Sequence, residues 1–279
     1  MLRVLVAGKS VHRELAASKR RQRLAVTAVF LGVLCCLVVV GGFFAVTRFS
    51  SEGLGPQQGQ RKDVGTGSND NGVVRAVVVD ALSLDDSKGS FVGEVRGVLE
   101  GEGFRVDVFS GSAVTVDSLK NLPGGCGVVL LRMHSAVAVN GEVYLFTGEN
   151  YSGGKYVEER GFGLVRQCFP GEGNESVFGV NWGFVRRLMA GRFNGSVVVA
   201  MGCESGVDEA LAEEFLGQGA SAFVGWSGPV LLSHSDEAVL ALTRCLCVEK
   251  LGVEVAVEKV NARLGGDPSS GAVLKCLVP

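Results

Sequence analysis

The chain has 279 residues, of which 47% are hydrophobic and 20% are charged, with a formal net charge of −2 at pH 7. That length suffices for one α/β domain once a membrane segment and a linker have taken up the first quarter. From Arg48 onward, 20 Lys and Arg residues oppose 28 Asp and Glu residues, a net charge of −8. A domain this acidic argues against nucleic acid as a partner.

The N-terminal region has the pattern of a single-pass membrane anchor. Residues 24–47 contain no charged side chain, and at about 1.5 Å per residue a helix of this length spans a hydrocarbon core of roughly 30 Å. Seven basic residues and one acidic residue lie in the tail 1–23, whereas Arg48 alone follows the apolar run. The positive-inside rule then predicts a cytoplasmic tail and a C-terminal domain outside the cytoplasm. The lipid bilayer is thus an expected partner of residues 24–47.

A cleaved signal peptide is the alternative interpretation of this region. Its apolar part should be only about 7–15 residues long, and Ala45-Val46-Thr47 is a poor cleavage site. Residues 48–72 are rich in Gly, Ser, Gln and Asn, which predicts a flexible linker to a domain at 73–279. Three glycosylation sequons in that domain, at Asn150, Asn174 and Asn194, agree with an extracytoplasmic location.

Strand and helix patterns alternate from residue 73 onward. The expected strands are 73–79, 104–109, 126–131, 142–147, 196–201, 220–226 and 272–277. The expected helices are 89–102, 182–191, 208–218, 235–250 and 252–264. Asn140-Gly141 is typical of a hairpin before the 142–147 strand, and residues 148–181 form a long stretch without a clear period. This alternation predicts an α/β fold with a mainly parallel sheet, covered on both faces, in which 126–131 is central.

The cysteines and histidines predict neither a disulfide scaffold nor a metal site. Of eight cysteines, Cys35 and Cys36 lie in the apolar run and the other six are spread over a long domain. Disulfide pairing is left open for five of them: Cys126, Cys168, Cys245, Cys247 and Cys276. Cys245 and Cys247 are too close together for a zinc knuckle, so we expect them to be buried on a helix. The three histidines form no ligand pair at short spacing, so neither a metal nor a cofactor is predicted.

Two residues that follow predicted strands could act together as a catalytic pair. In open parallel sheets, ligands bind beyond the carboxyl ends of the strands. His134 follows the 126–131 strand and Cys203 follows the 196–201 strand, so an imidazole and a thiol would lie side by side. The imidazole could remove the thiol proton and later protonate a leaving amine. A helix starting near Asp208 would also favour the thiolate through its dipole.

The segment Met201-Gly202-Cys203-Glu204-Ser205-Gly206 resembles the nucleophile segment of separase, and Leu216 to Trp226 resembles the strand that follows it in CHAT domains. Residues 73–277 are therefore similar to the caspase-like cysteine peptidase clan, which also includes caspases, gingipains and clostripain. In that clan the catalytic histidine and cysteine follow consecutive strands in this order. The resemblance implies a three-layer domain with a mainly parallel central sheet, a peptide or protein substrate, Cys203 as nucleophile and His134 as base. It also implies the backbone N–H groups of Ser135 and Cys203 as oxyanion donors.

The chain departs from the pattern of the clan at two positions. His134 is followed by Ser135 rather than by glycine, which affects how freely the next N–H group can turn into an oxyanion hole. Glu204 follows Cys203 directly, and its carboxylate would oppose thiolate formation unless it points away.

Other polar residues are auxiliary candidates at most. Asp80, which ends the first strand, could orient a histidine or recognise a basic substrate group, although capping the next turn is the simpler role. His234 is an alternative base at an expected helix start, where Ser235 or Asp236 would be the N-cap. Arg132 and Glu149 also follow or end strands and have no assigned role.

The sequence thus predicts a membrane-anchored extracytoplasmic cysteine peptidase. The alternative is a catalytically inactive caspase-like domain that serves as a tethered binding or sensing module. A different doubly wound enzyme would need a phosphate loop, and no G-x-G-x-x-G motif follows a strand in this chain.

Overall fold

The computed structural model describes residues 74–83, 90–171 and 173–279. The predicted tail, membrane span and linker lie outside these residues. Across the part of the chain that is described, no helix is both long enough and apolar enough to cross a membrane.

A six-stranded sheet with the order β10-β9-β8-β3-β1-β2 forms the centre of the domain. Its strands are β1 (Arg75–Asp80), β2 (Arg105–Ser110), β3 (Cys126–Arg132), β8 (Val197–Ala200), β9 (Ala222–Trp226) and β10 (Leu274–Leu277). All neighbours pair in parallel except β10, which is antiparallel to β9. The predicted parallel sheet is confirmed, and the 126–131 run is central as expected. Its continuous apolar side chains suit a strand that is buried on both faces.

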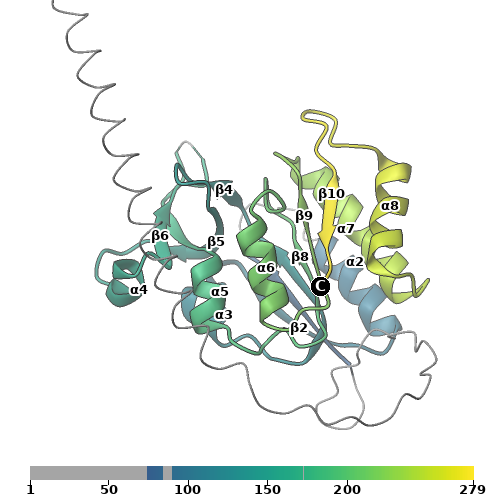
Figure 1. Cartoon of the computed structure of the whole chain (residues 1–279), viewed down its shortest axis with the longest axis horizontal. Coiled ribbons are helices and arrows are strands. Elements are labelled where there is room, and N and C mark those ends of the chain that lie inside the picture. Colours follow the sequence, from purple (N-terminus) through teal and green to yellow (C-terminus); the bar gives the residue numbers. More distant parts are fainter. Residues whose placement is uncertain (1–73, 84–89, 172) are drawn as a thin grey trace, which may run out of the picture. The chain divides into compact units, whose positions relative to one another are not determined.

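Helices cover both faces of this sheet, as the alternating pattern predicts (Figure 1). One layer consists of α2 (Ser90–Gly101), α7 (Leu232–Cys247) and α8 (Val253–Leu264), and the other of α3 (Val116–Lys120), α5 (Trp182–Leu188) and α6 (Glu209–Gly217). Successive residues of β3 point into different cores, because Leu130 packs in the core of the first layer and Leu131 in that of the second. The domain is therefore a helix–sheet–helix sandwich with a core on each side.

A second, antiparallel sheet has the order β4-β5-β7-β6. Its strands are β4 (Ser135–Val137), β5 (Val143–Asn150), β6 (Val165–Cys168) and β7 (Val177–Val180), and α4 (Val157–Gly161) lies between β5 and β6. The Asn140-Gly141 hairpin is confirmed, since Gly141 has a φ of 85° and β4 pairs with β5. The predicted strand 142–147 is confirmed as β5, and the stretch 148–181, in which no period was visible, contains α4, β6 and β7. β6 and β7 are only four residues long, too short for a strand period to be visible.

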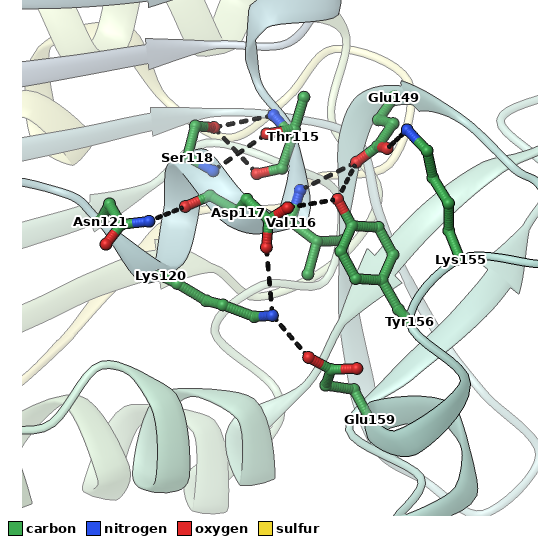
Figure 2. Close-up of polar contacts among 10 residues, drawn as sticks. All are labelled: Thr115, Val116, Asp117, Ser118, Lys120, Asn121, Glu149, Lys155, Tyr156 and Glu159. Atoms are coloured by element: carbon green, nitrogen blue, oxygen red, sulfur yellow. Dashed lines mark hydrogen bonds and ion pairs between the residues drawn. The ribbon is translucent and has the colours of Figure 1, made fainter.

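Glu149, at the end of β5, attaches this second sheet to α3. Figure 2 shows its carboxylate accepting hydrogen bonds from the Val116 N–H (3.2 Å), the Tyr156 hydroxyl (2.9 Å) and the Lys155 ammonium (2.8 Å). A carboxylate at the first turn of α3 is favoured by the helix dipole. Burial and the hydrogen bond to Glu149 raise the pKa of the Tyr156 hydroxyl. The role of Glu149 is therefore structural.

Candidate active site

His134 and Cys203 follow neighbouring parallel strands. Leu131 of β3 pairs with Ala200 of β8, and the Met201 N–H continues the ladder by donating to the Leu131 carbonyl at 2.9 Å. His134 and Cys203 each lie three residues beyond that pair, past the carboxyl end of their strand. The predicted meeting of the two segments at one edge of the sheet is therefore observed.

Gly202 allows the two segments to pack together. A Cβ atom at this position would lie 2.5 Å from the Met133 carbonyl oxygen and 2.8 Å from the Ser135 nitrogen, closer than real Cβ contacts. Beside it, the buried Ser135 hydroxyl donates to the Cys203 carbonyl at 2.6 Å. The serine that replaces glycine after His134 thus ties the histidine segment to the cysteine segment. No local sequence pattern indicates this contact, because Ser135 and Cys203 are 68 positions apart.

The Ser135 N–H group points away from the second sheet. The Phe146 N–H of β5 donates to the His134 carbonyl at 2.8 Å, and Ser135 faces Leu145 in the β4–β5 register. In an antiparallel ladder only alternate residue pairs exchange hydrogen bonds, so Ser135 directs its N–H out of the β4–β5 pair. The Ser135 N–H group therefore points to the side from which Gly202 approaches. An oxyanion donor beside Cys203 would have to lie on this side.

The sulfur of Cys203 contacts the loop that follows β9. The Val230 N–H donates to Sγ at 3.4 Å, and the thiol donates to the Val230 carbonyl at 3.5 Å. The next residue, Glu204, has a left-handed backbone (φ 59°), and its N–H donates to the Gly228 carbonyl at 2.9 Å. The cysteine segment is therefore bound to the loop on the β9 side.

A tight turn after Cys203 packs against β9. The buried Ser205 hydroxyl donates to the Ala200 carbonyl at 2.8 Å and accepts from the Trp226 N–H at 3.0 Å. A Cβ atom at Gly225 would lie 2.7 Å from the Gly206 nitrogen, so both backbones need glycine here. These contacts hold the candidate nucleophile on a rigid part of the fold.

Cys203 differs from most of the other described thiols by its accessibility. Cys203 and Cys276 are partly exposed, and the remaining four are buried: Cys126, Cys168, Cys245 and Cys247. All six are free thiols. Burial raises the pKa of Cys126 to about 11 and that of Cys168 to about 12. The expectation that Cys245 and Cys247 are buried on a helix is confirmed, since both lie in α7.

His134 is one of the residues that line a cavity of about 120 Å³ between the turn after β1 and the second sheet. Leu82, Phe146, Glu175 and Val177 line the same cavity. Among the described residues, Cys203 does not line this cavity. His134 therefore borders a space between the turn after β1 and the second sheet, whereas the Cys203 sulfur contacts the loop after β9.

A buried ionic cluster lies directly before His134. Arg132 is 0% exposed, and its guanidinium donates to Asp80 at 2.8 Å through Nη1 and to Asp236 at 2.8 Å through Nε. Burial alone would lower the pKa of Arg132, but the two carboxylates raise it above its usual value. Asp80 also accepts from the Leu82 N–H at 3.1 Å, which confirms the capping role. Asp80 and Arg132 therefore stabilise the carboxyl edge of β1 and β3.

The predicted N-cap at Ser235 or Asp236 was wrong. Helix α7 begins at Leu232, so both residues lie inside its first turns. Their polar groups have tertiary partners instead: Ser235 bonds to the Trp226 indole and the Met201 carbonyl, each at 3.0 Å, and Asp236 binds Arg132. Such side-chain contacts override the local preference for a cap.

His234 packs against Trp226, with ring centroids 5.5 Å apart. Its Nε2 atom is buried and has no hydrogen-bond partner. This position against the indole of Trp226 in β9 suits a packed side chain more than a catalytic base.

In the described part of the chain, no group of three or more His, Cys, Asp or Glu side chains could hold a metal ion. No protein-family model matches the chain, and a search of curated proteins found no match.

Proposed function

We propose that the domain is a caspase-like cysteine peptidase, held outside the cytoplasm by an anchor at residues 24–47, with Cys203 as nucleophile and His134 as base. One observation carries this proposal. The two residues follow neighbouring parallel strands, and the Ser135 hydroxyl bonds to the Cys203 carbonyl at 2.6 Å. A mostly parallel sheet with helices on both faces supports the clan resemblance.

The proposed reaction needs only groups of this chain, the peptide and water. His134 takes the proton of Cys203, and the thiolate attacks the carbonyl carbon of the scissile bond. The N–H groups of Ser135 and Cys203 stabilise the resulting oxyanion. Collapse breaks the C–N bond, and the imidazolium protonates the departing amine. Water then hydrolyses the thioester and regenerates the thiol. For this reaction the sulfur must exchange its contact with the Val230 carbonyl for one with the substrate.

A catalytically inactive binding or sensing module is the second candidate. It is favoured by the hydrogen bond from the Cys203 thiol to the Val230 carbonyl, which stabilises the protonated form, and by the cavity whose lining includes His134 but not Cys203. A module of this kind would use the cavity for recognition and leave the thiol unreactive.

The rate of thiol alkylation separates the two candidates. In the purified full chain at pH 7, we expect iodoacetamide to label Cys203 at least about tenfold faster than Cys276, the other partly exposed described thiol. Mass spectrometry of the cysteine peptides gives both rates in one sample. His134→Ala should slow the labelling of Cys203, and His234→Ala should leave it unchanged. Equal rates at Cys203 and Cys276, together with no effect of His134→Ala, would favour the binding module.

The proposed topology has a separate test. Protease added to intact cells or right-side-out vesicles should release the 73–279 domain by cutting within residues 50–72. The reason is that the positive-inside rule predicts a cytoplasmic position for the basic tail, and so an extracytoplasmic one for the domain. Immunoblots against the two ends of the chain follow the cleavage, and detergent-opened vesicles are the control. A domain that is protected until detergent is added contradicts this orientation.

A further inference from the structure

The loop 227–231, between β9 and α7, connects the Cys203 segment to the turn before β10. On one side, its Gly228 carbonyl accepts from the Glu204 N–H, and Val230 contacts the Cys203 sulfur. On the other side, the Ser227 N–H donates to the Val273 carbonyl at 3.0 Å, and the Ser270 hydroxyl donates to the Pro229 carbonyl at 2.5 Å. The position of Val230 at the sulfur therefore depends on the 267–273 turn.

Asp267 is the central residue of that turn and is 2% exposed. One carboxylate oxygen, Oδ1, accepts from the N–H and hydroxyl groups of Ser269 and Ser270. The other oxygen, Oδ2, accepts from the Leu231 N–H at 2.7 Å. The hydrogen bond from the Ser269 hydroxyl, with the other N–H donors, holds the pKa of Asp267 well below its ordinary range. The carboxylate is thus an ionised bridge between the turn and the loop.

We propose that Asp267 is a positioning residue for Cys203: by binding Leu231, it fixes the adjacent Val230 N–H against the sulfur. This inference rests on the proposed role of Cys203 as nucleophile. A thiol can donate to the Val230 carbonyl, but a thiolate can only accept, so the Val230 N–H is the contact that remains after the proton leaves. A hydrogen bond to the charged form favours that form. A loop held in place therefore promotes the reactive thiolate.

Asp267→Asn is the sharpest variant for a test. A side-chain amide has one acceptor oxygen where the carboxylate has two. It can accept from the turn or from Leu231, but not from both sides as Asp267 does. Ser270→Ala is a milder second variant, because it removes the hydroxyl that bonds to the Pro229 carbonyl, to Asp267 Oδ1 and to the Ala272 N–H, but it leaves the Asp267–Leu231 bond in place. Glu149→Gln is the matched control, since Glu149 also bridges two segments but lies at α3 (Figure 2).

The measurement is the iodoacetamide labelling rate of Cys203 in the purified full chain, across a pH series. Asp267→Asn should lower the rate at pH 7 about three- to tenfold and approach the wild-type rate at high pH, where the thiol ionises without help. Ser270→Ala should show a smaller shift in the same direction, and Glu149→Gln none. His134 and Glu204 are present in every variant. The difference between the pH profiles therefore measures the effect of the loop 227–231 on the labelling of Cys203. General loosening would instead speed the labelling of buried Cys247 at every pH.

The outcome is separable from that of the peptidase proposal. Unchanged profiles in both Asp267→Asn and Ser270→Ala would overturn the role of Asp267, even in a chain that hydrolyses peptides. A fall in labelling at pH 7 supports that role, and it would do so even if no peptide were cleaved.

Discussion

Cys203→Ala and His134→Ala should each lower kcat for peptide hydrolysis by at least about 10³-fold, because a nucleophile and its base act as one unit. The thermal midpoint should change little, since both side chains are partly exposed at the end of the sheet. Ser135, which ties the two segments together, remains in both variants. Turnover of a fluorogenic peptide library by the purified full chain and differential scanning fluorimetry measure the two effects.

The double variant and a histidine control make this test specific. Cys203→Ala combined with His134→Ala should be no slower than either single variant, since the losses within one catalytic unit are not additive. His234→Ala should keep most of the wild-type rate, because that imidazole packs on Trp226. Full activity in Cys203→Ala would end the assignment of Cys203 as nucleophile, whereas the absence of hydrolysis by the wild-type chain would leave the binding module.

Arg132→Ala should lower the free energy of unfolding by about 3–5 kcal/mol, because it leaves buried carboxylates without their cation. The side chains of Arg132 and Asp80 are 1% and 3% exposed, and Asp236 binds the same guanidinium. Urea unfolding followed by tryptophan fluorescence measures the loss, with Trp226 buried beside α7 as a reporter.

Arg75→Ala is the matched control for Arg132→Ala. Arg75 also pairs with a carboxylate, that of Asp107, but its side chain is 29% exposed on the edge strand pair β1–β2. Solvent screening limits such a pair to about 0–1 kcal/mol. A loss in Arg132→Ala as small as that in Arg75→Ala would contradict the importance of the buried cluster.

Much of the main sheet can be predicted from the sequence, because its signal is local. The run Ala76–Val79 is fully buried, and such continuous β-branched runs occur in parallel strands that are covered on both faces. The second sheet has weaker signals. Gly179 lies in β7 where a Cβ atom would meet the Cys168 sulfur at 2.4 Å, so packing rather than strand propensity selects glycine there. α3 is a single turn, too short for a helical period.

The candidate site also combines features that the sequence predicts with features that it does not predict. The sequence pattern predicts that His134 and Cys203 each follow a strand, and the expectation that these two strands are neighbours agrees with the pairing of β3 and β8. Their surroundings are not predicted, because the partners are far apart in the chain. Arg132 reaches Asp236 across 104 residues, and Leu231 reaches Asp267 across 36. Such contacts are set by the packing of α7 and β10 onto the sheet, and no local motif encodes them.

A crystal structure of the chain after reaction with a peptide aldehyde tests the proposed dyad most directly. We expect a thiohemiacetal between the Cys203 sulfur and the aldehyde carbon, with its oxygen about 3 Å from the N–H groups of Ser135 and Cys203. The His134 imidazole should then lie within hydrogen-bond reach of the adduct. A structure in which the sulfur stays against Val230 without an adduct, or in which the imidazole remains remote from an adduct that forms, would contradict the assignment of His134 and Cys203 as a catalytic pair.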